Sequence, residues 1–233
     1  MDARAALSAA HQVTVLLRDL MADRQATDAL DVLVAKSRDV LSFDGCSITL
    51  KSDHGARTVS STDDNVLHAD TLQYQFDEGP CLDAMSRDDR YVITDLSTDS
   101  LWPRWGPPAE ELGIASMLSI RLVGERTRGS LNLYAGRPRT SNPEEIMLGE
   151  VLAAQAGMVL NTIENHTNLR AGLDGRTVIG QAVGILMERY ELDSDAAFAT
   201  LRRLSMDNNV KIRTLAEEIV RSRRLPFAGA EDG

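Results

Sequence analysis

The sequence predicts an α+β domain with a central antiparallel sheet, then a long helix and an all-α bundle of three helices. Three observations lead to this fold class. Between residues 46 and 137, short segments rich in β-branched residues alternate polar and apolar positions, as strands do. From Ser141 onward, apolar residues recur at helical spacing. Two polar turns then divide the last part of the chain into short amphipathic segments.

The first elements are helical. Residues 5–22 keep apolar side chains at helical spacing, which predicts an N-terminal helix within a segment 1–24. A second helix is predicted from about Asp28 to Leu41, inside a domain that we assign to residues 25–141.

Five segments of this domain predict strands. CSITLK and ARTVSSTD flank a turn, HGAR, so residues 46–62 predict a hairpin. The segment 90–96 predicts a short strand, and 114–123 and 128–137 predict two more, joined by GERT. A helix is expected over 64–76, before the chain break at Gly79-Pro80. A loop with three prolines that leads into a helical turn is expected over 101–113. Strands mixed with helices in this way favour one central sheet.

The next helix has a strong start signal. Asn142 is a good capping residue, Pro143 suits the first turn, and Glu144 and Glu145 favour the positive end of the helix dipole. The pattern predicts a connecting or dimerising helix over residues 142–173, with a weak point at Gly172–Gly175.

The segment 174–224 predicts three short helices, and 225–233 a flexible tail. Each helix has one apolar face. On the first helix, Gly180 and Gly184 lie away from that face and leave a groove without side chains, open to a neighbouring helix or to a flat ligand such as a nucleobase. The residues expected in the core are Ile179, Ala182, Val183, Leu186, Tyr190, Ala197, Phe198, Leu201, Leu204, Ile212, Leu215, Ala216 and Ile219.

Charge is unevenly distributed along the chain. The net charge is −10, and residues 1–165 carry all of it, with 15 basic and 25 acidic residues. Residues 196–225 hold 7 basic and 3 acidic residues, a local charge of +4. A basic end on an acidic body favours an interaction module that attracts phosphates.

Composition also excludes several classes of protein. Two cysteines are too few for a disulfide framework or a metal cage and suit a reducing cytosol. No signal peptide and no apolar stretch of about 18 residues is evident, so we expect a cytoplasmic protein without a membrane span. The four histidines are scattered and no glycine-rich phosphate loop is present, so we expect no enzyme, no metal and no cofactor.

The segment RTVIGQAVGILMERYELDSDAAFATLRRLSMDNNVKIRTLAEEIV resembles the ANTAR domain, a three-helix RNA-binding module of bacterial transcription antitermination regulators. The resemblance implies a homodimer that binds paired stem–loops in nascent transcripts. One departure is Val183, where many members have lysine. The residues expected to contact RNA are Arg176, Gln181, Gly184, Met187, Arg189, Arg202, Arg203, Asn208, Lys211 and Arg213.

The preceding part resembles the GAF domain, a sensory fold often placed before ANTAR in actinobacterial regulators. EGPCLDAM, VITDL and SMLSIRLVGERTRGSLNLYA carry this resemblance. It implies a small-molecule or redox signal of unknown identity. Cys81 follows Gly-Pro at a predicted helix start, which suits either a thiol of lowered pKa or a buried apolar group. Trp102 and Trp105 either cover a pocket or form a small cluster under their loop.

Two alternatives to RNA binding remain from the sequence. The three helices resemble a helix-turn-helix arrangement enough to allow a DNA-binding regulator. The basic face is also compatible with a protein-interaction module that binds an acidic partner.

Overall fold

The computed structural model describes residue 11 and residues 26–52, 55–87, 89–123 and 128–225 of the chain. The chain forms two compact units, residues 1–163 and residues 164–233. The predicted helix over 5–22, apart from residue 11, the GERT connection and the tail from residue 226 lie outside the described residues.

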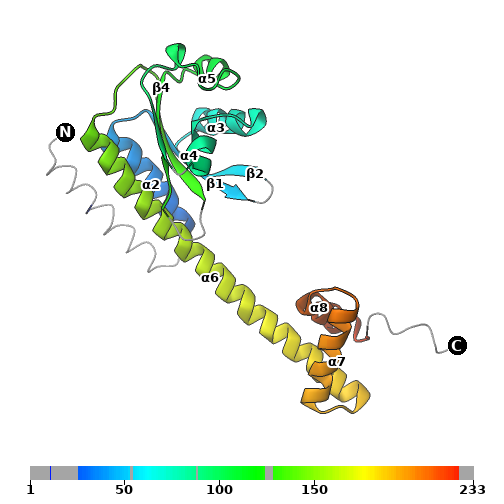
Figure 1. Ribbon diagram of the computed structural model, residues 1–233. Coiled ribbons are helices and arrows are strands. Elements are labelled where there is room, and N and C mark those ends of the chain that lie inside the picture. The colour runs from blue at the N-terminus through cyan, green and yellow to red at the C-terminus, as the bar shows by residue number, and fades with distance from the viewer. Residues whose placement is uncertain (1–10, 12–25, 53–54, 88, 124–127, 226–233) are drawn as a thin grey trace. The chain divides into compact units, whose positions relative to one another are not determined.

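The first unit contains a five-stranded antiparallel sheet with helices on both faces (Figure 1), so the predicted α+β class is confirmed. In chain order its described elements before the long helix are α2 (Ala26–Leu41), β1 (Gly45–Ser52), β2 (Gly55–Ser61), α3 (Asp64–Phe76), α4 (Pro80–Arg87), β3 (Arg90–Ile93), η1 (Leu96–Thr98), α5 (Gly106–Glu111), β4 (Ser116–Arg121) and β5 (Gly129–Ala135).

The strands follow the order β2-β1-β5-β4-β3. The predicted hairpin over 46–62 is confirmed, because β1 and β2 pair antiparallel down to Ser52 opposite Gly55. β4 and β5 also pair as predicted, and β5 lies at the centre of the sheet between β4 and β1. The strand predicted over 90–96 is shorter in the structure. It ends at Ile93, and the Asp95 carboxylate then accepts the Ser97 N–H and starts a 3-10 turn.

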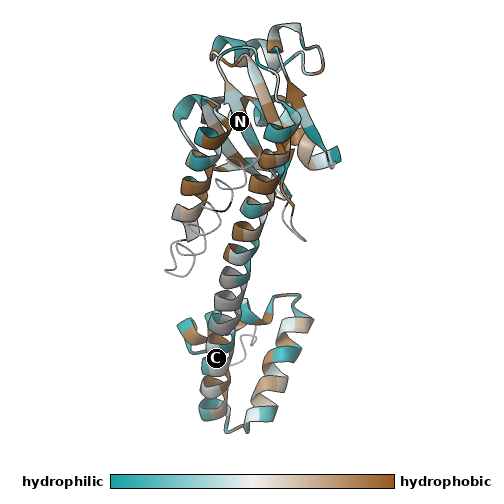
Figure 2. Ribbon diagram, turned by 90° about the vertical axis from the view of Figure 1, so that its left-hand side faces the viewer, coloured by the Kyte–Doolittle hydropathy of each residue, from teal (hydrophilic) through white to brown (hydrophobic). Residues whose placement is uncertain are grey.

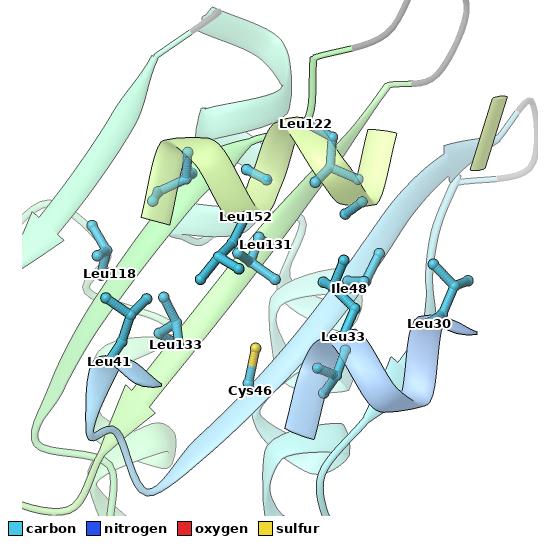
Figure 3. Close-up of a cluster of buried hydrophobic side chains, with 14 of the residues drawn as sticks. Leu30, Leu33, Leu41, Cys46, Ile48, Leu118, Leu122, Leu131, Leu133 and Leu152 are labelled. Carbon is cyan, nitrogen blue, oxygen red and sulfur yellow. The ribbon is translucent and has the colours of Figure 1, made fainter. Parts of the chain in front are cut away.

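One face of the sheet is aliphatic and the other is largely polar. On the aliphatic face, side chains of α2, β1, β4, β5 and α6 (Pro143–Tyr190) point toward one another, among them Leu33, Ile48 and Leu152 (Figure 3). On the other face, α3 and α4 cover Ser47, Ser119 and other polar side chains, all fully buried. Alternation along each strand produces this difference, because successive side chains point to opposite faces.

Helix α6 starts as the sequence predicts. The Asn142 side chain accepts the Glu145 N–H, and the Glu145 carboxylate accepts the Asn142 N–H in return. The helix is much longer than predicted, with 48 residues, and the predicted interruption at Gly172–Gly175 is absent. A glycine costs a helix about 1 kcal/mol but leaves its backbone hydrogen bonds intact, so flanking turns carry the helix through.

The first part of α6 is a core helix. Its segment Pro143–Asn165 is long and apolar enough to cross a membrane by length and composition, which corrects the expectation that no such stretch exists. Half of the most apolar window is buried against the protein itself, and Leu148, Leu152 and Ala156 belong to the aliphatic core. Packing against the sheet therefore accounts for the apolar composition of this segment.

Gly157 allows α6 to approach the end of β4 closely. A Cβ atom at this position would collide with the backbone carbonyl of Val123. We expect Gly157→Ala to destabilise the protein by about 1–3 kcal/mol, because backbone cannot move aside as a side chain does. Urea unfolding would measure the change. Gly180→Ala, in the same helix but in open space, is the matched control and is expected to stabilise by up to about 1 kcal/mol. A stabilising Gly157→Ala would show that the contact is not tight.

In the second unit the end of α6 packs against α7 (Ser194–Asp207) and α8 (Ile212–Ser222). Hydrophilic and hydrophobic residues alternate along these helices, as expected of amphipathic helices (Figure 2). The Asp193 carboxylate caps α7 by accepting the Ala196 N–H at 2.7 Å. Eight buried residues form the core: Ala182, Val183, Leu186, Ala197, Leu201, Leu215, Ala216 and Ile219.

Two residues that the sequence predicts in this core are exposed. Phe198 is 44% exposed and Tyr190 is 41% exposed. Ala197 and Leu201 are four residues apart and define the buried side of α7. Phe198 follows Ala197 directly, which rotates its side chain by about 100° around the helix and away from the core.

Candidate functional site

A groove runs between the end of α6 and the end of α8. It is open to solvent and offers about 740 Å³ of space, and we refer to it as the glycine groove. Its lining residues are Gln181, Gly184, Ile185, Glu188, Arg189, Val220 and Arg223.

Gly184 leaves the groove open. Apart from Gly184, its two chain neighbours and the adjoining backbone of α6, no atom lies within 4 Å of the position that a Cβ atom would take at Gly184. The nearby walls include the apolar side chains of Ile185 and Val220, each only partly buried. Gly180 is equally open, but it is not among the residues that line the groove. The site therefore combines apolar surface with space that a flat group is able to enter.

Positive charge lies beside this space. The Arg189 guanidinium donates a hydrogen bond to the Arg223 carbonyl at 2.8 Å and so ties the end of α8 to α6. Arg223 ends α8 in a left-handed conformation, with φ of 60°. Two guanidinium groups and one carboxylate, that of Glu188, thus border the groove. This balance favours an anionic or polar ligand.

Only three of the predicted RNA contacts meet in the glycine groove: Gln181, Gly184 and Arg189. Arg202 and Arg203 lie in a separate hollow on α7, and Arg176 and Lys211 are exposed elsewhere on the unit.

The remaining three predicted contacts have structural partners. Met187 is partly buried and packs against the core of the bundle. Asn208 ends α7, and its amide donates to the Leu204 carbonyl. Arg213 forms an ion pair with Glu217 at 2.9 Å. Spacing on one helix does not reveal such partners.

The first unit holds a second candidate site, a buried polar cluster beneath α3. Asp70 on α3 is fully buried, and its carboxylate accepts hydrogen bonds from the hydroxyls of Tyr134 and Thr58. The Tyr74 hydroxyl bridges Thr58 and Thr49, at 2.8 Å from each. Asp70 therefore joins α3 to β2 and β5 at the centre of the cluster.

Asn132 on β5 extends this network across the sheet. Its amide nitrogen donates to Thr49 at 3.0 Å and Ser47 at 3.2 Å, and its oxygen accepts from Ser119 at 2.8 Å. It thereby links β1, β5 and β4. Buried polar groups must be hydrogen-bonded, because an unpaired one costs roughly 1–3 kcal/mol.

Burial raises the pKa of Asp70 to about 6, and the hydrogen bonds from Tyr134, Ser47 and Thr58 oppose that rise. The carboxylate therefore takes up a proton at mildly acidic pH. The ionised Asp70 carboxylate only accepts hydrogen bonds, whereas the protonated form also donates one. Protonation would therefore require one of its hydroxyl partners to accept a hydrogen bond instead of donating it.

Cys81 and Trp102 both lie in the interior. The Cys81 N–H donates to the Gln73 side chain at 2.9 Å, and burial, followed by the nearby Asp70 charge, raises the pKa of the Cys81 thiol well above its usual range. This corrects the alternative of a lowered pKa. Trp102 donates its indole N–H to Asp83 and packs edge-to-face against Tyr91, so it is part of a buried cluster.

Sequence reasoning missed Asp70 and its partners. The alternation of Ser47 and Thr49 on β1, and of Asn132 and Tyr134 on β5, shows that these polar residues share a face. Alternation of this kind is typical of a solvent-exposed face, and only the packing of α3 and α4 shows that the face is covered.

Two family models match the chain. The GAF domain model matches residues 23–161, and the ANTAR domain model matches residues 167–220. None of the curated proteins compared with the chain matches it.

Solved structures share the fold of the first unit. The GAF domain of a phosphoenolpyruvate-protein phosphotransferase from Coxiella burnetii is 18% identical, with a TM-score of 0.58 over 72% of this chain and 99% of that one. The corresponding domain from Acinetobacter is 17% identical, with a TM-score of 0.57 over 70% and 97%. The free methionine-R-sulfoxide reductase from Neisseria meningitidis is 12% identical, with a TM-score of 0.57 over 71% and 95%.

Proposed function

Since the chain belongs to the GAF domain family and also carries an ANTAR domain, a domain of RNA-binding regulators, we propose that it is a transcription antitermination regulator. In this proposal the ANTAR domain binds stem–loops in nascent transcripts and prevents a terminator hairpin from forming. The GAF domain receives the signal that controls this activity, and the protein works in the cytoplasm.

The glycine groove is the observation that supports this function. Bases in the loop of an RNA hairpin are unstacked, so their faces and edges are accessible, unlike those of a paired stem. An open space of about 740 Å³ beside Gly184, with Ile185 and Val220 in its walls, suits the flat face of a base. Arg189 and Arg223 lie where they would attract the neighbouring phosphates.

We propose that the active form is a homodimer. One groove offers room for few nucleotides, so a single bundle would bind weakly. Two bundles that hold two linked loops raise the overall affinity through effective concentration, without any new contact.

The GAF domain is proposed to sense a signal without catalysing a reaction. GAF and ANTAR domains are regulatory domains. Cys46 and Cys81 are both fully buried, and burial raises the pKa of each thiol above its usual range. Oxidation requires an accessible thiolate, so these properties favour a small molecule over a redox signal at either cysteine.

The test is binding of the full-length protein to three labelled nucleic acids across a range of salt concentrations. These are an RNA with two hairpin loops, the same stems without loops, and a duplex DNA of the same sequence. We expect saturable binding to the looped RNA and at least about ten-fold weaker binding to the other two. Equal binding to the duplex DNA would favour the DNA-binding alternative. Absence of binding to all three would favour the protein-interaction module.

A further inference from the structure

The outward face of α7 carries apolar side chains that the fold does not use. Phe198 is 44% exposed and Met206 is 69% exposed. Together they border a surface depression of about 320 Å³ that shares no residue with the glycine groove. We refer to it as the α7 hollow, and its lining residues are Asp195, Phe198, Ala199, Arg202, Arg203 and Met206.

The guanidinium groups of the α7 hollow differ from others in the same unit. Arg213 and Arg221 form ion pairs with glutamates of α8, and Arg189 donates to a backbone carbonyl. Arg202 and Arg203, in contrast, have no hydrogen bond or ion pair to any residue that the structure describes. Their charge is therefore available to a ligand, with Asp195 as the one acidic residue that lines the hollow.

We propose that the α7 hollow is a second nucleotide site, in which an unpaired RNA base stacks on the Phe198 ring. Arg202 and Arg203 contact the phosphates on either side of that base. The inference rests on the proposed RNA-binding function and adds a contact outside the glycine groove. An exposed aromatic side chain that shares a hollow with two unpaired cations matches the chemistry of single-stranded nucleic acid, which offers base faces and phosphates in alternation.

The arginine charges argue against a second copy of the chain as the occupant. In a symmetric dimer the same patch lies on both sides of the interface. Contact through the α7 hollow would bring Arg202 and Arg203 of both copies together. Like charges at such distances repel, and the hollow provides only Asp195 from each copy to offset them.

The test uses Phe198→Ala and Phe198→Trp in the full-length protein, with a hairpin RNA that carries 2-aminopurine at one loop position at a time. We expect Phe198→Ala to weaken binding about ten-fold and to abolish the fluorescence quenching at one loop position. Phe198→Trp should retain both the RNA affinity and the quenching. Tyr190→Ala is the matched control, since Tyr190 is a similarly exposed aromatic residue outside the hollow. It is expected to bind as the unchanged protein does.

The arginines have a separate readout. Arg202→Ala and Arg203→Ala are each expected to reduce the slope of log affinity against log salt by about 0.7, the change for one phosphate contact on a single strand. Arg221→Ala, which removes an arginine that is paired with Glu218, is expected to leave the slope unchanged.

Several outcomes would overturn the inference. If Phe198→Ala binds RNA normally while a substitution in the glycine groove abolishes binding, the α7 hollow is not a nucleotide site and the proposed function stands. If the unchanged protein binds no hairpin, the proposed function fails first. Sedimentation would also give the oligomeric state of Phe198→Ala. If this variant loses both its affinity for RNA and its self-association, a second copy of the chain covers this face instead. Circular dichroism would verify that each variant folds.

Discussion

Gly184→Leu is expected to weaken RNA binding by at least about ten-fold and at the same time to stabilise the protein. A leucine side chain would extend into the glycine groove, because no side chain from elsewhere in the described structure lies within 4 Å of a Cβ atom at Gly184. Loss of a bound base should lower the affinity for a looped RNA by at least about ten-fold, or 1.4 kcal/mol. Leucine also favours helix over glycine, so the free energy of unfolding should rise by about 0.5–1 kcal/mol. Titration with looped RNA and urea unfolding measure the two effects.

Gly180→Leu is the matched control for this prediction. Gly180 lies in the same helix and in open space, but outside the lining of the groove. It should therefore give the same gain in stability with little change in RNA affinity. If both variants bind RNA as the unchanged protein does, the groove is not the RNA site. If only Gly180→Leu loses binding, the ligand contacts an earlier turn of α6.

Asp70→Asn is expected to remove a large pH dependence from the stability of the first unit. Burial raises the pKa of Asp70 to about 6 in the folded protein, whereas an aspartate in an unfolded chain titrates near 3.9. Between these values the folded protein binds more protons than the unfolded chain. The contribution of Asp70 to stability is therefore fully present below about pH 4 and is lost as the pH rises through 6. The difference between a pKa of about 6 in the folded protein and about 3.9 in the unfolded chain corresponds to roughly 3 kcal/mol of stability.

The measurement is the difference in unfolding free energy between the unchanged protein and Asp70→Asn at several pH values from 4 to 8. As the pH rises, we expect the unchanged protein to lose roughly 3 kcal/mol of unfolding free energy relative to Asp70→Asn, with most of the loss between pH 4 and 6. Taking the difference cancels the titration of the other carboxylates. A difference that stays constant would mean that the Asp70 carboxylate is solvated and that the buried network described around it is wrong.

The helices and strands of this protein could be predicted closely where local chemistry determines their ends. Helix α3 has the predicted bounds because Asp63 caps its first turn and the chain turns at Asp77 after its last. The β1–β2 hairpin follows from alternation and a short turn. The missing break in α6 was not predictable in the same way, because glycine makes a helix less stable without forbidding it.

The candidate sites were predictable only as far as a single helix reaches. Gln181 and Gly184 are three residues apart on one helix, so their spacing places them near each other before any tertiary structure is known. Val220 and Arg223 complete the glycine groove from α8, and packing of the bundle alone brings them there. Met187 and Asn208 are also predicted to contact RNA, and the fold gives both of them protein partners: Met187 packs against the core of the bundle, and the Asn208 amide donates to the Leu204 carbonyl.

The sequence by itself therefore determined the fold class and the alternation of the strands, since both depend on local pattern, and its motifs carried the resemblance to the GAF and ANTAR domains. The tertiary structure decided which polar and apolar faces are covered. A period of two places Ser47, Thr49 and Asn132 on one face of the sheet, but burial of that face depends on the helices that pack over it. Phe198 is exposed for the complementary reason, because the core of a small bundle has room for one side of α7 only.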